Sequence, residues 1–272
     1  MSALTVLKFG GELLETDERR GAMATAIRRM AKRTSVVVVH GGGREVDADM
    51  AVHGIEKRAV DGLRITDAPT LDIVVGVLAG RVNTRLVATL GSIGVHAVGL
   101  TAADGDIASV RMAAPYAAAD GATVDLGFVG QPTGGGSRLI EMLCAAGFVP
   151  VVASIGASDD GQLLNVNADT LAGHLAASLG ADRLLIAGGT AGVLDPDGAT
   201  IPAVDDALMD QLIGDGRASA GMVAKLVACR AAARSGVARV DIVTGKQTDN
   251  LDTSAGTRIE VPPVGGSEST ES

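Results

Sequence analysis

Two glycine turns are the parts of this sequence with the clearest capacity for chemistry. The stretch "LKFGGELL" places Lys8 just before Gly10 and Gly11, and "VVVVHGGGREVD" ends a valine run with a histidine and the glycines of residues 41–43. Because glycine has no side chain, backbone N–H groups in such a turn can approach an anion, and a following helix adds the positive end of its dipole. Both turns are therefore candidate phosphate-binding loops.

A run of short polar side chains, "NVNAD", is a second candidate. Asn165, Asn167 and Asp169 alternate, so an extended segment would aim all three to one side, as a substrate-facing strip that enters a helix. A calcium loop is disfavoured because Thr170 stands where that loop needs glycine and Ala176 where it needs glutamate. An Asx-rich helix start with Asp169 in the first turn remains equally open.

Two cationic side chains could bind anions near these loops. Lys225 falls in an Ala/Val helix shortly after an expected turn at Gly221. Arg64 falls in a loop just before a helix expected to start at residues 67–70, where its guanidinium could clamp a carboxylate. Either side chain could instead be an ordinary surface residue.

Several familiar sites are absent from the sequence. No GxxxxGK[ST] occurs and no GxGxxG follows an expected strand, so a P-loop is excluded and a nicotinamide site loses its main support. His40 is expected to hydrogen-bond a loop carbonyl, because the other three histidines form no metal-ligand spacing with it.

The elements that must position these residues alternate between strand and helix. Short, nearly continuous apolar runs are typical of strands buried on both faces: "LTVLKF", "SVVVVH", "VHAVGL", "FVPVVA", "RLLIAG" and "RVDIVT". Ala/Leu-rich segments between them predict helices, and the alternation predicts an α/β fold with an open, mainly parallel sheet between helix layers. Residues 111–136 break the pattern and predict a β-hairpin inserted at the sheet edge, and residues 263–272 are expected to be a disordered tail.

Composition limits the environment and the partners. The 272 residues carry a net charge of −9, which argues against nonspecific binding to nucleic acid or anionic membranes. Cys144 and Cys229 lie in apolar or Ala-rich surroundings and are expected to be buried, reduced thiols. No secretory signal is visible, and the uncharged run at residues 142–158 is too short and too broken for a membrane helix. We therefore expect a soluble, cytoplasmic protein.

Taken in order, these motifs resemble the amino acid kinase family over nearly the whole chain. The residues that carry the resemblance are "KFGG", "HGGG", "GLRIT", "NVNAD", "GMVAK" and a late "GTRI". Within the family, "GLRIT" and "NVNAD" are most similar to the branch that phosphorylates N-acetylglutamate with ATP in arginine biosynthesis. The resemblance implies small-molecule substrates and MgATP, with magnesium held mainly by the nucleotide phosphates and no protein metal site.

The same resemblance implies roles for individual residues. Lys8 and Lys225 would stabilise the transferring phosphoryl group, and Asp169 would hold both ammonium groups. Backbone N–H groups of the first glycine turn would bind the phosphoryl group. The second glycine turn, Arg64 and Asn165 would hold the acceptor. The glycines in these roles are Gly10 and Gly11 for the phosphoryl group, and Gly42 and Gly43 for the substrate.

The nucleotide side departs from the family pattern. The strand "RLLIAG" runs into "GTAGVLDPDG", which lacks the aspartate that the family usually carries in this turn. Adenosine contacts are nonetheless expected from Gly188, Gly189, Thr190, Ala191, Gly192, Arg217, Ala218 and Ser219. A single domain over residues 1–262 is expected, with substrate binding and dimerisation before about residue 180 and nucleotide binding from about residue 181.

The resemblance also bears on assembly and on competing functions. Arginine-inhibited members of the family carry an additional N-terminal helix that joins dimers into a hexamer. Here the first strand is expected within the first few residues, so the chain resembles the homodimeric, arginine-insensitive members. A hexamer by light scattering or inhibition by arginine would contradict this expectation. The same chemistry on an aminoadipate-type acceptor remains an alternative. A non-catalytic, amino-acid-sensing copy of the fold is disfavoured, because Lys8, Asp169 and Lys225 are all present.

Overall fold

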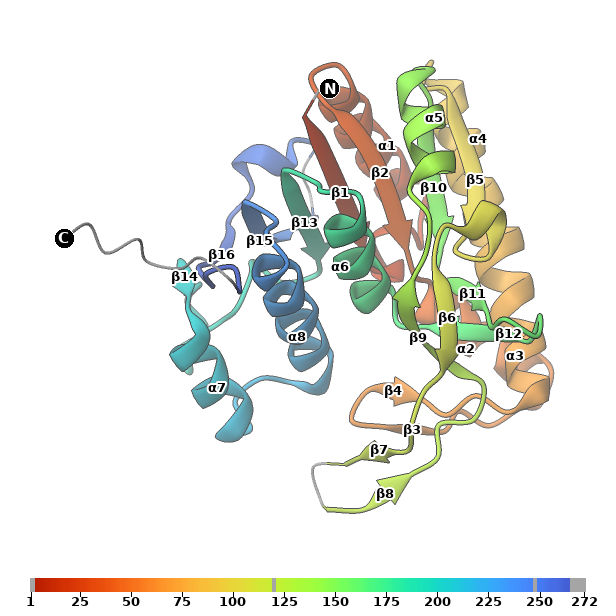
Figure 1. Cartoon of the computed structure of the whole chain (residues 1–272), viewed down its shortest axis with the longest axis vertical. Coiled ribbons are helices and arrows are strands. Elements are labelled where there is room, and N and C mark those ends of the chain that lie inside the picture. Colours follow the sequence, from red (N-terminus) through yellow and green to blue (C-terminus); the bar gives the residue numbers. More distant parts are fainter. Residues whose placement is uncertain (1–2, 119–120, 247–248, 265–272) are drawn as a thin grey trace.

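An eight-stranded sheet forms the centre of the molecule (Figure 1). The computed structural model describes residues 3–118, 121–246 and 249–264. The strand order is β14-β16-β15-β13-β1-β2-β10-β5, in which β15 and β16 run antiparallel and the other neighbours run parallel. The predicted α/β fold with a mainly parallel sheet is therefore confirmed.

The central strands match the apolar runs of the sequence. Four expected strands coincide with observed ones residue for residue: β1 (Leu4–Phe9), β2 (Ser35–His40), β13 (Arg183–Gly188) and β15 (Arg239–Thr244). The rest of the sheet consists of β5 (Ala97–Thr101), β10 (Val149–Ala153), β14 (Ala203–Val204) and β16 (Gly256–Ile259). The match follows from β-branched side chains, which suit strands covered on both faces.

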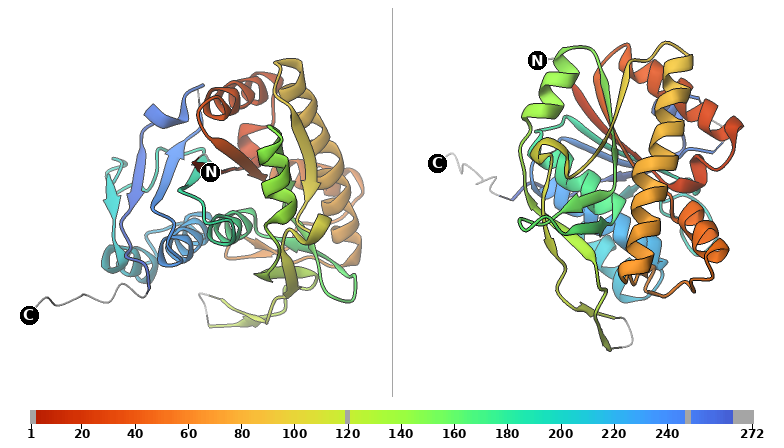
Figure 2. Two further views of the ribbon diagram at one scale, coloured as in Figure 1. Left: turned by 45° about the horizontal axis from the view of Figure 1, so that its top comes forward. Right: turned by 90° about the vertical axis from the view of Figure 1, so that its right-hand side faces the viewer.

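Helices cover both faces of the sheet, as the views in Figure 2 show. On one face, α5 (Arg138–Ala145), α6 (Ala168–Ser178), α7 (Asp206–Gly214) and α8 (Ala220–Arg234) pack against side chains such as Val6 and Val37. On the other face lie α1 (Asp17–Ala31), α2 (Gly43–Val52), α3 (Ala68–Val75) and α4 (Asn83–Ser92), against side chains such as Leu7 and Val38. Alternate residues of one strand thus enter different cores.

The expected hairpin forms, but it does not extend the main sheet. Strand β6 (Ser109–Met112) pairs antiparallel with β9 (Val129–Gly134), and between them β7 (Tyr116–Ala117) pairs with β8 (Thr123–Val124). Strands β6 and β9 close a small barrel with β11 (Ile155–Ala157) and β12 (Leu163–Val166). The expected place at the sheet edge is therefore wrong, because the alternating pattern gives pairing within the hairpin but not its outer partners.

One helical run is long and apolar enough to cross a membrane by length and composition. It covers Ala68–Ser92 and joins α3, a π-helical turn η2 (Gly76–Val82) and α4. Its apolar side chains Val74, Leu78, Leu86 and Leu90 are buried in the core between this run and the sheet. The run is therefore packed as a core helix of the fold.

Cysteine burial differs between the two thiols. Cys229 on α8 is fully buried, and burial raises its pKa. Cys144 on α5 is only half-buried, so the expectation of burial is wrong for it, although partial burial raises its pKa to about 11. Neither forms a disulfide with the other.

We expect Leu86→Ala to lower the free energy of unfolding by about 2–5 kcal/mol, because it removes buried methyl groups and leaves a cavity. Leu86 has 0% exposed area, within the core that the long helical run shares with the sheet. Val52→Ala, at a side chain with 81% exposure, is the control and should change stability by less than about 0.5 kcal/mol. Urea denaturation measures both; equal effects would contradict the core packing of this helix.

Candidate active site

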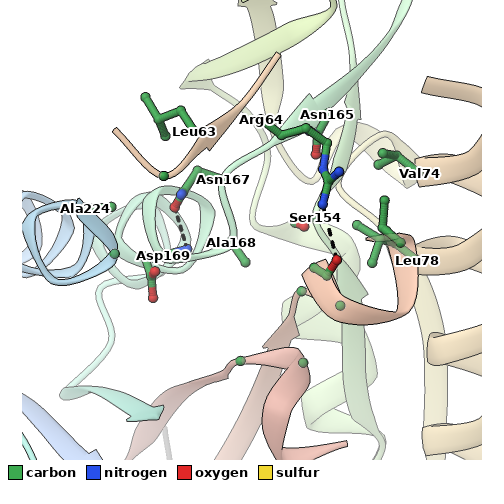
Figure 3. A pocket seen from close by; sticks show the side chains of 18 of the residues that line it. Leu63, Arg64, Val74, Leu78, Ser154, Asn165, Asn167, Ala168, Asp169 and Ala224 are labelled. Carbon is green, nitrogen blue, oxygen red and sulfur yellow. Dashed lines mark hydrogen bonds between the residues drawn. The ribbon is translucent and has the colours of Figure 1, made fainter. Parts of the chain in front are cut away.

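A cavity of about 400 Å³ opens at the carboxyl ends of β1 and β2 (Figure 3). In parallel sheets this is the edge where loops and helix starts converge. Residues from both glycine turns, from "GLRIT", from "NVNAD" and from α8 line it together. The site residues that the sequence predicted and the structure brings together are Lys8, Gly10, Gly11, Gly42, Gly43, Arg64, Asn165, Asp169 and Lys225.

A carboxylate flanked by two lysines lies at one end of the cavity. Lys8 Nζ is 2.7 Å from Asp169 Oδ1, and both side chains are more than nine-tenths buried. Lys225 Nζ is 3.7 Å from Asp169 Oδ2 and also donates to the Gly221 carbonyl at 3.1 Å. One negative charge thus holds two positive charges, which leaves a net positive centre suited to an anion.

Three separate elements place these side chains. Lys8 points from β1 toward the layer of α6 and α8, because it shares its face of the strand with Val6. Asp169 lies in the first turn of α6, where Asn167 caps the helix by accepting from the amides of Asp169 and Thr170 at 2.9 and 3.0 Å. Lys225 comes from α8, which packs along α6.

The "NVNAD" segment is both of the alternatives that the sequence left open: it faces the cavity, and it forms the start of a helix. Asn165 lies on β12, Asn167 is the helix cap and Asp169 is helical, so the alternation of an extended chain is not what brings them to one site. All three nevertheless line the cavity. The turn from strand to helix brings them there.

The glycines of the two turns are needed chiefly for close packing. A Cβ atom on Gly11 would lie 2.7 Å from the Gly42 Cα, and one on Gly42 would lie 2.8 Å from Leu78 Cδ2. Gly43 has open space beside it and begins α2, so its amide is one of the N–H groups that a helix leaves without an internal acceptor. The Gly10 amide donates to the Ala187 carbonyl at a long 3.4 Å, and its role as a donor to the phosphoryl group stays a prediction.

The buried side chain of His40 holds the second glycine turn in place through a hydrogen bond. The imidazole is fully buried; its Nδ1 lies 3.0 Å from the Gly41 carbonyl oxygen, and Asn83 Nδ2 lies 3.1 Å from its Nε2. Asn83 also donates to the Val151 carbonyl at 2.9 Å, so the amide nitrogen is a donor and His40 Nε2 accepts. The expected bond between His40 and a loop carbonyl is confirmed. Burial lowers the pKa of His40 to about 4, against the smaller opposing effect of the bond to Gly41.

Arg64 lies at the opposite end of the cavity, in the short strand β4 (Leu63–Arg64) rather than the expected loop. Its guanidinium pairs with Asp47 and donates to the Gly43 carbonyl at 3.2 Å. Burial alone would raise the pKa of Asp47, but hydrogen bonds from Lys57 and Arg64 outweigh it and lower that pKa. Arg64 is thus held in place by Asp47, at the wall of the cavity. The following helix α3 begins at Ala68 with Asp67 as its cap, as expected.

The remaining wall combines polar and apolar groups. Asn165 Nδ2 donates to Thr66 Oγ1 at 3.1 Å, which ties β12 to the "GLRIT" segment. Ser154, Val74 and Leu78 complete this side, as Figure 3 shows. Sequence reasoning missed these three residues, and it also missed Glu12, which lines the same cavity. Only Glu12 had a signal, since it directly follows a glycine turn.

The residues expected to bind the nucleotide do not line this cavity, and the structure gives some of them packing roles. Gly188 ends β13 close to Lys225, and Gly189 follows it. Gly192 has a φ of +89° and lies so close to Thr257 that a side chain would collide, while Thr190 Oγ1 donates to the Gly192 carbonyl at 3.2 Å. Arg217 is half-exposed and pairs with Asp215, and Ala218 and Ser219 lead into α8. Their nucleotide role stays a prediction.

Within the part of the chain that the structure describes, no group of three or more His, Cys, Asp or Glu side chains is arranged to hold a metal ion. The cavity instead presents ammonium groups and backbone amides. That magnesium is held mainly by the nucleotide phosphates stays a prediction.

The sequence pattern of the amino acid kinase family matches residues 3–244. The chain belongs to the amino acid kinase family. An acetylglutamate kinase of Novosphingobium aromaticivorans is 38% identical over 251 residues, which cover 89% of this chain and 83% of that protein. An acetylglutamate kinase of Endomicrobium trichonymphae is 37% identical over 245 residues, covering 90% of this chain and 94% of that protein.

Solved structures share the amino acid kinase fold. A protein of Streptococcus mutans superposes with a TM-score of 0.81 at 28% identity, over 95% of this chain and 99% of that one. Carbamate kinase of Giardia lamblia superposes with a TM-score of 0.69 at 15% identity, over 95% and 98% of the two chains, and this likeness concerns the fold alone.

The buried His40 gives a testable pH dependence. Its folded pKa of about 4 lies below the ordinary 6.5, so the unfolded state binds more protons between these values, and stability falls as pH falls through this window. Between pH 7 and pH 5 the contribution is about 2 kcal/mol. We expect His40→Gln to lose that share of the pH dependence of the free energy of unfolding, measured by urea denaturation. His53→Gln, at an exposed histidine, is the control; identical profiles for wild type and His40→Gln would contradict the assignment.

Proposed function

We propose that this chain catalyses transfer of the γ-phosphoryl group of ATP to the γ-carboxylate of N-acetyl-L-glutamate, which gives N-acetyl-L-glutamyl 5-phosphate in arginine biosynthesis. The observation that carries the proposal is the pair of lysines on one buried aspartate, beside two glycine turns. Kinship with acetylglutamate kinases, at close to two-fifths identity over most of the chain, supports the acceptor.

Repulsion between like charges is the main barrier in this reaction. The acceptor carboxylate is ionised at neutral pH, so it can attack phosphorus without a general base. Catalysis then depends on alignment and on neutralisation of charge at the moving phosphoryl group. Lys8 and Lys225 supply that positive charge from two sides, and Asp169 keeps both ammonium groups at fixed positions. The amides of Gly11, Gly42 and Gly43 are further donors for the phosphoryl oxygens.

The far end of the cavity is suited to hold the acceptor. Arg64 can receive the α-carboxylate, because Asp47 and the Gly43 carbonyl orient its guanidinium at the wall. Asn165 offers an amide to neighbouring polar atoms, and Val74 and Leu78 supply an apolar surface for methylene or methyl groups. The acceptor's γ-carboxylate would then point toward Lys8 and Lys225.

The donor would approach from the side of β13 and α8. Gly188 lies close to Lys225, so a nucleotide held by residues 188–192 and 217–219 would place its phosphates toward the lysines. Magnesium bound to the phosphates would neutralise part of their charge. The family resemblance alone supports two further parts of the proposal, a homodimer and a cytoplasmic location.

Acyl-phosphate formation, trapped with hydroxylamine as a hydroxamate, tests the proposal directly. Purified protein and MgATP are supplied with N-acetylglutamate, glutamate, aspartate or aminoadipate. We expect a signal with N-acetylglutamate alone. A signal with aminoadipate would keep the chemistry and replace the acceptor, whereas no signal with any acceptor in a folded sample would contradict the kinase proposal.

For the lysines, we expect Lys8→Ala and Lys225→Ala each to lower turnover by roughly 10²- to 10⁴-fold, because each loses charge stabilisation at the transferring group. Lys32→Ala, at an exposed lysine just after α1, should leave turnover unchanged. Circular dichroism checks that each variant is folded. Near-normal turnover in either active-site variant would remove that lysine from the mechanism.

A further inference from the structure

Glu12 occupies a place where a phosphate-binding protein normally avoids negative charge. It follows the first glycine turn within the short helix η1 (Gly11–Leu13) and lines the cavity. Its Oε1 accepts a hydrogen bond from the Gly189 amide at 3.0 Å, across 177 residues of sequence. A carboxylate therefore takes the first amide that follows β13, on the side where the nucleotide is expected.

The same carboxylate also covers the first glycine turn. A Cβ atom on Gly10 would collide with both oxygens of Glu12, so the space that this glycine leaves is filled by the Glu12 carboxylate. A Cβ atom on Gly188 would lie 3.8 Å from Glu12 Oε1 and 3.7 Å from Lys225 Cε. Glu12 thus lies between the turn after β1 and the turn after β13, close to a lysine of the site.

Charged side chains of both signs lie near Glu12. Burial raises the pKa of Glu45, and the carboxylates of Glu15 and then Glu12 raise it further. Lys246 flanks Gly189 from outside: a Cβ atom there would lie 3.3 Å from Lys246 Cε and 3.6 Å from Glu12 Cγ. This exposed ammonium offers a partner for the Glu12 carboxylate once that carboxylate leaves the amide.

We propose that Glu12 is an internal anion that competes with the phosphate groups of ATP for the Gly189 amide, and so weakens nucleotide affinity. The inference rests on the proposed function, since it concerns the donor side of that site. A polyphosphate brings several negative charges into the region of a hydrogen-bonded carboxylate, and two like charges at about 4 Å repel strongly in a partly buried site. ATP must therefore displace Glu12 from Gly189, at a cost in binding free energy.

Calorimetric titration of the whole protein tests this inference, with ATP, with MgATP and with tripolyphosphate as probes. We expect Glu12→Gln to lower the Kd of all three by about tenfold, because the amide side chain keeps the shape and removes the charge. Glu12→Ala should give a similar gain, because it also removes the charge. The KM for ATP should fall in step, and the KM for N-acetylglutamate should not change.

Glu15→Gln is the matched control, since it removes the same charge from the same segment while its carboxylate pairs with Arg19 and Arg44 instead of Gly189. It should leave the Kd values within about twofold. An equal gain in affinity in Glu15→Gln would show that any nearby negative charge repels the ligand, without a specific role for the bond to Gly189, and would overturn the inference. Unchanged or weaker binding in Glu12→Gln would overturn it too, and weaker binding of MgATP alone would mark Glu12 as a magnesium ligand.

The outcomes also separate this inference from the proposed function. Tighter tripolyphosphate binding in Glu12→Gln, together with no hydroxamate from any acceptor, would support the inference and contradict the kinase proposal. Hydroxamate from N-acetylglutamate, with identical Kd values in wild type and Glu12→Gln, would do the reverse. If neither wild type nor Glu12→Gln binds any of the three probes, both proposals fail.

Discussion

The Asp169 carboxylate holds lysines from β1 and α8 while it sits in the first turn of α6. A buried charge is costly unless it is paired, so the three side chains depend on one another. Their pairing ties the central strand of the sheet to two helices of one layer, and it fixes where positive charge meets the two glycine turns. The acceptor would bind on the Arg64 side of this charged group, and the donor would bind on the side of β13 and α8.

Charge is balanced closely throughout the site. Arg64 is compensated by Asp47, the lysines are compensated in part by Asp169, and Glu12 adds a negative charge beside the turn after β13. A site with such balance does not hold anions simply by excess positive charge. Each bound anion must instead replace a contact that the protein already makes with one of its own carboxylates. The site therefore selects among anions by which of these contacts the anion can replace.

The sequence predicted the frame of the fold, and it predicted the two lysines, the aspartate and the glycine turns that line the cavity. Continuous β-branched runs gave β1, β2, β13 and β15, because burial on both faces leaves a pattern that local reading can detect. The meeting of Lys8 with Lys225 came from the resemblance, since 217 positions of chain separate them and only the packing of α6 and α8 against β1 unites them. No local sequence pattern encodes the pairing of the hairpin with the other strands of the barrel. The same holds for the hydrogen bond between Glu12 and Gly189, because both contacts join residues that are far apart in the sequence.

Leu78 has a consequence for redesign of the acceptor pocket. Its side chain lines the apolar wall of the cavity and also packs where a Cβ atom on Gly42 would be. Acceptor shape and the geometry of the second glycine turn therefore share one side chain. An engineer who enlarges the pocket at Leu78 to admit a longer acceptor also removes the support beneath Gly42, so new selectivity at this position is coupled to the rate of the chemical step.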